Sequence, residues 1–451
     1  MTSDNAWSRR YNPAMPNLKE RLRFVPEPLC DLRKLYVVDA AERLREHLRV
    51  VFVPSEQHCL LAQEMLGIAH ARAKLTYSGE LPFLRSAYAD QLPYPSDSIT
   101  CLTGLSNVGK SAFERAMCRL LSSPESVSVR NHEPFALEGI WSLEAEERSS
   151  LRRLVRKYLK SGEVQSIQSS TELEDHVRRQ IYLRGVCLLM LGELQFVAKG
   201  NDANITIVNL VMQLARLGPP ISFSANFSLL HKLRRRPEEE RRRLFARIRE
   251  IEPDSRGSTA WKECCIAFCA AAPEFADLLT AQTTADTLHA YTFGTRGRLA
   301  KLLELAYRSA RETNGAKVLL AHVDRAYQSV DYLDERVTIR ALERQAIEGG
   351  PVRDITKHER RDLHNPYAQR TNGTVTVAKQ LAVAHAQRVH EAMVQAACTP
   401  EEKARIGPKL RASGKGNNVS PIVRKPRPDK ESLLAAAEKF RQSATKRSGS
   451  K

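Results

Sequence analysis

The chain has 451 residues, of which 42% are hydrophobic and 27% are charged, and its formal net charge at pH 7 is +18. This length suffices for two or three domains with apolar cores. No apolar stretch is long enough to span a bilayer, and residues 1–10 lack the apolar segment of a signal peptide. We therefore expect a cytoplasmic protein with no membrane partner, and the charge predicts a polyanionic partner such as DNA or RNA.

The nine cysteines are scattered along the chain. Only Cys264, Cys265 and Cys269 form a cluster, and no second C-x-x-C arm or histidine pair accompanies it. This spacing predicts buried thiols in a helix rather than a zinc site or a disulfide framework.

The segment before residue 54 is expected to be an N-terminal arm and helix that bind a partner, over residues 1–53. Residues 1–30 are rich in Pro and Arg without apolar periodicity, which predicts a flexible arm. Residues 35–48 and 55–74 have helical patterns, and Ser55 is placed to cap the second helix.

A phosphate-binding motif begins the nucleotide-binding core, which we expect over residues 54–255. An apolar strand at 99–103 leads into the template G-x-x-x-x-G-K-[ST], and a helix from Ala112 follows it. In such loops backbone N–H groups surround the phosphates, the lysine reaches the β- and γ-phosphates, and the hydroxyl binds Mg²⁺. The predicted ligands of ATP are Gly104, Leu105, Ser106, Asn107, Val108, Gly109, Lys110, Ser111 and Ala112, with Ser111 on the metal.

Strands and helices alternate through the rest of this core. Strands are predicted at 134–141, 186–191 and 221–225, and a helix is predicted at 204–217 before Gly218-Pro219-Pro220. This alternation is typical of βαβ units. It predicts an α/β fold in which helices flank a parallel sheet.

A basic amphipathic helix is predicted at residues 148–160. Leu151, Leu154 and Val155 belong to its apolar stripe, and no acidic residue interrupts the segment from 151 to 160. The opposite face is either solvated or a nucleic-acid contact. The candidate DNA-binding residues on this face are Arg152, Arg153, Arg156, Lys157 and Lys160.

Polar residues follow two of the predicted strands. Glu193 follows the apolar run 186–191, where a P-loop ATPase with an extra central strand carries its catalytic glutamate. Gly192 stands where an aspartate on the metal side is usual. Asn226 follows the strand 221–225, where an amide can contact the γ-phosphate or the attacking water. The alternative readings are a surface residue at a strand end for Glu193 and a turn residue for Asn226.

Arginines near the end of this core could act on nucleotide from outside the loop. Arg243 and Arg247 lie in an arginine-rich segment that could enter a neighbouring subunit's site, although a solvated charged helix is a rival interpretation. A helical lid is predicted over residues 256–335. Arg298, with Arg296 as second choice, begins a lid helix and is placed to bind nucleotide.

The residues after the lid are expected to form a basic, partly disordered extension over 336–451. Residues 409–451 hold twelve Lys and Arg residues against three acidic ones, which concentrates positive charge there. An Ala-rich helix is predicted at 376–397 and a short amphipathic helix at 429–442. The latter could dock on a partner or remain solvated.

The order of these motifs resembles that of AAA+ ATPases. More closely, residues 188–195 followed by a long helix, then 222–233 and 242–247, are similar to the TnsC/TniB regulators of transposition. The resemblance covers roughly residues 54–333. It implies an AAA+ P-loop core with a C-terminal helical lid, ATP and Mg²⁺ as cofactors, Glu193 as catalytic glutamate, Asn226 as sensor, and Arg243 or Arg247 acting in trans.

The family resemblance also implies partners. Such regulators assemble with ATP on double-stranded DNA as rings or filaments, and they link a target-selector protein to transposase subunits. A bacterial, nucleoid-associated location follows. Gly192 departs from the family pattern and predicts slow or partner-dependent hydrolysis.

Other classes of protein remain open at this point. A helicase loader or an IstB-like DNA helper shares most of these features, but those chains usually carry little beyond the core. A nucleotide-gated DNA-binding scaffold with little hydrolysis is favoured by Gly192. A signalling ATPase of the STAND type would carry repeats after the lid, and the sequence has none there.

Overall fold

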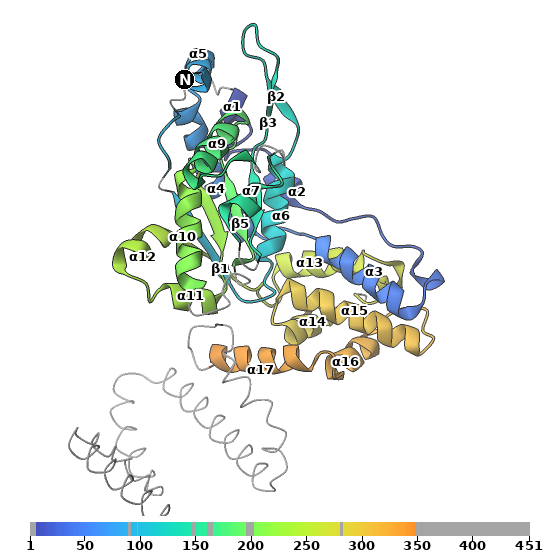
Figure 1. The fold of residues 1–451 in the computed structure, drawn as a ribbon. Coiled ribbons are helices and arrows are strands. Elements are labelled where there is room, and N and C mark those ends of the chain that lie inside the picture. Colours follow the sequence, from blue (N-terminus) through green and yellow to red (C-terminus); the bar gives the residue numbers. More distant parts are fainter. Residues whose placement is uncertain are drawn as a thin grey trace, which may run out of the picture. The chain divides into compact units, whose positions relative to one another are not determined.

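The computed structural model describes residues 6–88, 92–96, 98–146, 149–159, 166–194, 203–279, 283–347 and 353. These residues belong to one compact unit, residues 1–364 (Figure 1). No helix within these ranges is both long and apolar enough to cross a bilayer. The helices expected at 376–397 and 429–442 lie outside the described residues.

A five-stranded parallel sheet forms the centre of the fold, with strand order β4-β5-β6-β1-β7. Its strands are β1 (Ile99–Gly104), β4 (Trp141–Glu144), β5 (Leu189–Gly192), β6 (Ile221–Ser224) and β7 (Arg247–Ile251). Every residue of β1, β5 and β6 is buried, as apolar runs predict for strands covered on both faces. The predicted α/β class, with helices flanking a parallel sheet, is confirmed.

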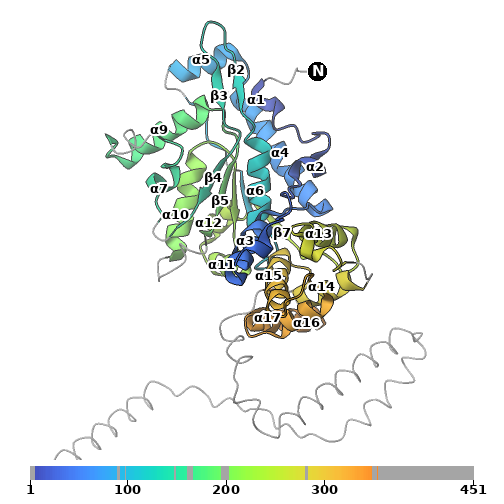
Figure 2. The same cartoon turned by 90° about the vertical axis from the view of Figure 1, so that its right-hand side faces the viewer.

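Helices cover both faces of the sheet, and each face has its own apolar cluster. Leu102 of β1 packs with α4 (Glu56–Thr76) and α6 (Lys110–Leu121), whereas its neighbour Cys101 points to the other face. Figure 2 shows α4 and α6 on one side of the sheet and α10 on the other. The helices of this second face are α7 (Leu151–Val155), α9 (Ser170–Leu183), α10 (Ala203–Arg216) and α11 (Phe227–Leu233).

The expected flexible arm is wrong for residues 6–22. This segment forms α1 (Ala6–Arg9) and α2 (Leu18–Leu22), and Trp7, Tyr11 and Leu22 are buried in the cluster on the α6 face. The Tyr11 hydroxyl donates to the Gly139 carbonyl oxygen (2.7 Å) and accepts from the Cys187 N–H (3.2 Å). A few widely spaced apolar residues therefore anchor a segment whose Pro and Arg content suggested disorder.

The lid is helical, as predicted, but its boundaries differ from 256–335. It comprises α13 (Thr259–Cys269), α14 (Thr284–Thr292), α15 (Arg296–Glu312), α16 (Leu320–Gln328) and α17 (Leu333–Ile347), so it continues beyond residue 335. The short 3-10 turns η1 (Leu32–Lys34) and η3 (Pro273–Phe275) also belong to this part. Helix α3 (Val37–Val50), expected in a separate N-terminal unit, packs on α15.

The cysteine cluster lies inside the lid. Cys264, Cys265 and Cys269 are buried on α13 as free thiols, which confirms the reading from the sequence.

Two local expectations in the core are wrong. The strand expected at 134–141 is divided between β3 (Phe135–Leu137), which pairs with β2 (Glu125–Val127) in an antiparallel hairpin, and β4 of the main sheet. The helix expected at 148–160 is only α7, because Tyr158 turns back onto β4. Its ring stacks on Trp141 at 4.4 Å, and its hydroxyl donates to the Ser142 carbonyl (2.8 Å).

Strand β7 was not predicted. Its sequence, Arg247–Ile251, holds three charged and two apolar residues on the edge of the sheet, where Arg249 and Glu250 are exposed. Charged side chains are a common device on edge strands, because they discourage pairing with other chains. The remaining helices are α5 (Glu80–Tyr88) and α12 (Glu238–Leu244).

Candidate functional site

The phosphate-binding motif forms a loop between β1 and α6, as its sequence predicts. Gly104 and Gly109 have φ values of 145° and 117°, which favour glycine, and a Cβ on Gly104 would collide with the Ile251 carbonyl oxygen of β7. Asn107 also has a positive φ, of 68°, at the tip of the loop. The loop leads directly into the N-terminus of α6, where helix N–H groups favour anions.

Lys110 and Ser111, the first two residues of α6, face the carboxyl edge of the sheet. The Lys110 Nζ donates to the carbonyl oxygens of Gly104 and Leu105, both at 2.9 Å. The Ser111 hydroxyl donates to Glu193 Oε1 at 3.1 Å. The hydroxyl proposed for Mg²⁺ and the carboxylate proposed for catalysis therefore meet across 82 residues of sequence.

Glu193 follows β5 in a conformation that few residues adopt. Its φ is 59°, in the left-handed region, which is unusual for a residue other than glycine, asparagine or aspartate. Such conformations are uncommon and concentrate at functional sites. Here the backbone turn directs the Glu193 carboxylate towards the loop that carries Ser111.

A second carboxylate, which the sequence did not single out, lies behind this pair. Glu114 is on α6, is 8% exposed and hydrogen bonds to Ser224 of β6. Burial raises the pKa of Glu114 to about 7. The nearby charge of Glu193 acts in the same direction, while the hydrogen bond from Ser224 and the charge of Lys110 oppose it.

Asn226 is the N-cap of α11, two residues after β6. Its Oδ1 accepts from the Leu229 N–H (3.0 Å) and from the Ser228 hydroxyl (3.0 Å), which fixes the side chain at the helix start. Asn226 also lines the same cavity as Lys110 and Glu193. The capping role and the sensor role are compatible, and the latter stays a prediction.

The lid meets the phosphate loop at the start of α15. The Gly297 N–H donates to the Asn107 carbonyl oxygen at 2.9 Å, and a Cβ on Gly297 would lie 2.9 Å from Asn107 Cβ. Beside this contact, the Arg296 guanidinium binds both carboxylate oxygens of Asp254 (2.9 and 3.2 Å) and the Val53 carbonyl (2.5 Å). Arg296 therefore joins the lid to the end of the core.

These groups enclose a cavity of about 630 Å³ between the phosphate loop and the lid. That volume is within the range of small-molecule sites. The core contributes the loop, Glu193 and Asn226, and α3 contributes two arginines. The charged residues that line it are Arg45, Arg49, Lys110, Arg115, Glu193, Arg296, Lys301, Glu304 and Glu335.

The other arginines proposed to act on nucleotide lie elsewhere. Arg298 is buried inside the lid, where it binds Glu335 (2.9 Å) and the Thr295 hydroxyl (3.0 Å). Arg296, the second choice, and Lys301 are the lid cations that line the cavity. Arg243 is exposed on α12, whereas Arg247 lies on β7 and donates to the Ser98 hydroxyl. The roles of Arg298, Arg243 and Arg247 stay predictions.

The predicted DNA-binding residues lie on α7 and the turn after it. Arg153, Arg156 and Lys157 are exposed, while Arg152 is half-buried and donates to the Ile167 carbonyl (2.5 Å). Lys160 is outside the described residues. The shortened helix therefore presents these side chains from a helix and a turn rather than from one continuous face.

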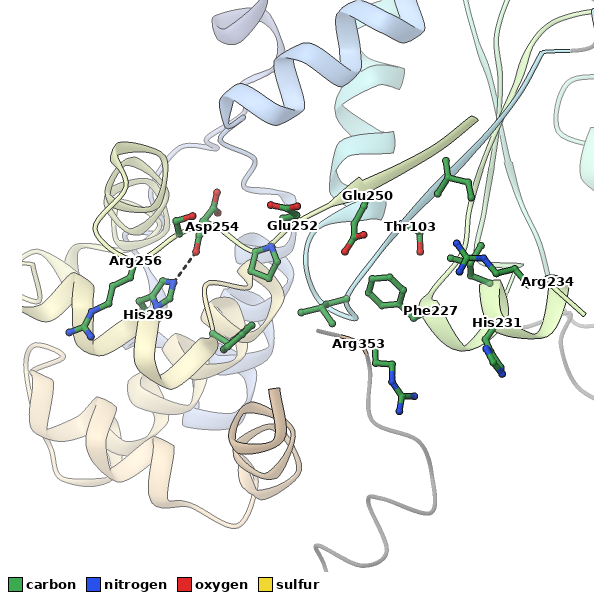
Figure 3. Close-up of a pocket in the computed structure, with 16 residues that line it drawn as sticks. Thr103, Phe227, His231, Arg234, Glu250, Glu252, Asp254, Arg256, His289 and Arg353 are labelled. Carbon is green, nitrogen blue, oxygen red and sulfur yellow. Dashed lines mark hydrogen bonds between the residues drawn. The ribbon is translucent and has the colours of Figure 1, made fainter. Parts of the chain in front are cut away.

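A second cavity, of about 710 Å³, is lined by Thr103 of β1 and by Leu105 at the start of the phosphate loop (Figure 3). Phe227 and His231 border it from α11, and Arg234 borders it from the position directly after that helix. His289 borders it from the lid, where its Nε2 contacts the Asp254 carbonyl at 2.8 Å. It is the larger of the two cavities, but the phosphate loop residues Lys110 and Ser111 line the other one. The smaller cavity is therefore the candidate nucleotide site on its chemistry.

The sequence missed several residues of the site. Glu114 follows Lys110 by one helical turn on the buried side of α6, so a carboxylate among apolar residues was the available signal. Lys301, Arg45 and Arg49 come from helices outside the core. Their approach depends on how the lid and α3 pack, which no local pattern reveals.

The class defined by this arrangement is a P-loop α/β fold with a helical lid. No protein-family model and no curated protein matches the chain. Among solved structures, it is similar to the Aeropyrum pernix ORC1 protein in complex with DNA, at 16% identity over 62% of this chain and 68% of the other, with a TM-score of 0.35.

Two further solved structures are similar at the same level. The Aeropyrum pernix ORC2 protein is 12% identical over 71% of this chain and 85% of its own, with a TM-score of 0.36. Drosophila ORC bound to DNA is 16% identical over 90% of each chain, also with a TM-score of 0.36. None of these similarities assigns an activity or a partner to this chain.

Proposed function

We propose that this protein is an AAA+ ATPase that uses Mg²⁺ and binds ATP between its phosphate loop and its lid. The observation that carries the proposal is the hydrogen bond between Ser111 and Glu193, at the cavity that Lys110 and Asn226 also line. The donor set fits a metal-bound nucleotide, because it combines a hydroxyl, a carboxylate and a lysine at a helix N-terminus.

In this proposal each residue has a separate task. The loop N–H groups and Lys110 would bind the phosphates, and Ser111 would hold Mg²⁺, which would supply positive charge to offset that of the phosphates. Glu193 orients the attacking water and accepts its proton. Asn226 contacts the γ-phosphate or that water.

The test of this site is a comparison of binding with turnover. Glu193→Gln should keep ATP affinity within about threefold and lower the hydrolysis rate at least about 100-fold, the range for a lost general base. Lys262→Ala, an exposed lysine on α13, is the control and should change neither quantity. Loss of binding in Glu193→Gln would assign this residue a structural role instead.

We further propose that the ATPase works on double-stranded DNA as a regulator of transposition. The net charge of +18, the exposed Arg153, Arg156 and Lys157, and the resemblance to TnsC/TniB regulators support this. Assembly into rings or filaments would bring Arg243 or Arg247 to a neighbour's site. A transposase and a target selector are the expected protein partners, and a bacterial cytoplasm with nucleoid association is the expected location.

Electron microscopy with duplex DNA, with and without a non-hydrolysable ATP analogue, tests the assembly. Rings or filaments that form on DNA only with nucleotide are expected. A monomer that ignores both ligands would contradict the assembly and leave a P-loop protein without a DNA role.

Gly192 favours a second candidate, a nucleotide-gated scaffold that binds ATP and DNA but hydrolyses slowly. The two candidates differ in turnover by the isolated protein on DNA. A hydrolysis rate that stays near background until a protein partner is added supports the scaffold. Rapid turnover on DNA alone excludes it.

A further inference from the structure

Gly192 ends β5 at the place where a metal-side aspartate is expected, and its backbone does not require glycine. Gly192 is not among the residues with positive φ. What glycine provides here is space, since an added Cβ would lie 2.8 Å from Glu114 Oε2, closer than real Cβ atoms approach. The three nearest atoms to that Cβ all belong to the Glu114 carboxylate.

Glu114 reaches this position from a different element. It lies on α6, one helical turn after Lys110, and its carboxylate lies against the end of β5 while it hydrogen bonds to Ser224 of β6. It is also close enough to Glu193 and Lys110 to interact with both electrostatically. A buried carboxylate thus occupies the volume that a side chain at position 192 would fill.

A buried carboxylate needs a reason, because removing an ionised acid from water is unfavourable unless a cation or several hydrogen bonds compensate. Leu, Met or Ala at position 114 would fill an α6 face whose neighbours Phe113 and Met117 are buried and apolar. Its electrostatic interactions with Lys110 and with Glu193, which accepts from Ser111, instead put the carboxylate next to the proposed position of the metal.

We propose that Glu114 supplies, from α6, the negative charge that an aspartate at position 192 would supply from β5, and that it positions the Mg²⁺ of the bound nucleotide. This inference rests on the proposed ATPase function. Glu114 is a positioning residue: it acts on the metal's surroundings while Ser111 and Glu193 face the cavity. The absence of an aspartate at position 192 then means that the carboxylate has moved from β5 to α6.

Removing the carboxylate at position 114, and moving it to position 192, tests this proposal. The readout is the ratio of ATP affinities with and without Mg²⁺, measured by titration of a fluorescent ATP analogue into the full chain, in Mg²⁺ or in EDTA. Glu114→Gln keeps size and hydrogen bonding but removes the charge, so it should reduce this ratio at least about tenfold, as the loss of residues that support metal ligands does. Affinity in EDTA should stay within about threefold.

Glu144→Gln is the matched control. Glu144 ends β4 in register with Gly192, but it is exposed, so its loss should leave the Mg²⁺ ratio unchanged. Gly192→Asp alone should unfold the site or abolish binding, because two carboxylates would share one volume. Gly192→Asp combined with Glu114→Ala should restore both folding and the Mg²⁺ ratio, with thermal unfolding as the check on folding.

The outcomes separate the two proposals. If the wild-type protein binds no ATP, the proposed function and this inference fall together. If it binds ATP with a Mg²⁺ dependence that Glu114→Gln leaves intact, only the inference is overturned. Should the double variant not fold, the Glu114→Gln ratio decides alone, because a role limited to packing would lower stability without changing that ratio.

Discussion

The two walls of the proposed nucleotide cavity differ in the partners of their positively charged side chains. On the core wall, the Lys110 ammonium donates to two backbone carbonyls of its own loop. On the lid wall, Arg296 forms a buried ion pair with Asp254, and Lys301 lies 3.6 Å from Glu335. A phosphate can draw a cation from neutral carbonyls more easily than from a carboxylate. The core wall is thus suited to binding phosphate, and the lid wall to holding the lid on the core.

The largest expected effect comes from breaking the lid wall. Arg296→Ala leaves Asp254 buried without its partner, and breaking buried pairs in this way lowers stability by about 3–5 kcal/mol. Urea unfolding of the full chain measures this. Arg308→Ala, which breaks the exposed pair with Asp331, is the control and should change stability by less than about 1 kcal/mol. Equal effects of both variants would mean that Arg296 does not join lid and core.

A substitution on the core side of the cavity, at Glu114, should instead increase the free energy of unfolding. Since folding raises the Glu114 pKa from 4.5 to about 7, the wild-type protein loses stability as the pH rises from about 4.5 to 7, and this loss persists above pH 7. Lys110, Arg115 and Glu193 are the charged groups that act on Glu114, and all remain in Glu114→Gln. That variant should therefore be more stable than wild type at pH 8, by up to about 3 kcal/mol.

The difference between the two proteins should disappear near pH 4, below the unfolded-state pKa of 4.5, where Glu114 is protonated in both the folded and the unfolded wild type. Other titrating groups, such as the buried His58, are common to both proteins and cancel in this difference. Thermal unfolding at pH 4 and pH 8 measures it. A difference that does not change with pH would show that Glu114 keeps an ordinary pKa.

These contrasts also mark what the sequence could predict. The phosphate loop, β1, β5 and β6 follow from a motif and from apolar runs, both of which are local signals. Ser111 was named from the motif and Glu193 from its place after an apolar strand, and the two residues hydrogen bond to each other in the structure. On the lid wall, the sequence named Arg296 only as second choice to Arg298 and missed Lys301, because these residues reach the cavity only through the packing of helices that are distant in sequence.

Errors in the fold have equally specific causes. Strand β7 carries charged residues that suit an edge strand, but its sequence continues the arginine-rich segment before it, which has the pattern of a helix. Helix α7 ends early because Tyr158 stacks on Trp141. Residues 6–22 are anchored by Trp7 and Tyr11, whose burial depends on surfaces formed much later in the chain. In each case a tertiary contact overrides the local pattern.

Removing the lysine of the core wall should affect the ligand rather than the fold. Lys110→Ala should weaken ATP binding about 100-fold, or about 2.7 kcal/mol, since a charge-assisted contact to phosphate is lost. The thermal unfolding midpoint without nucleotide should change less than in Arg296→Ala, because the hydrogen bonds to Gly104 and Leu105 are to neutral carbonyls, although the charge of Lys110 also interacts with Glu114. Isothermal titration calorimetry with ATP and Mg²⁺ measures the affinity, and an affinity equal to wild type would contradict the assignment of the loop.

The smallest effect is expected from the matching lysine of the lid wall. Lys301 lines the cavity, but its ammonium lies 3.6 Å from Glu335, which also binds Arg298. Because a carboxylate already offsets this charge, Lys301→Ala should weaken ATP binding by no more than about threefold, well below the effect of Lys110→Ala. The same calorimetric titration compares the two variants. If both lysines prove equally important, the lid wall binds phosphate directly, and the contrast between the two walls no longer holds.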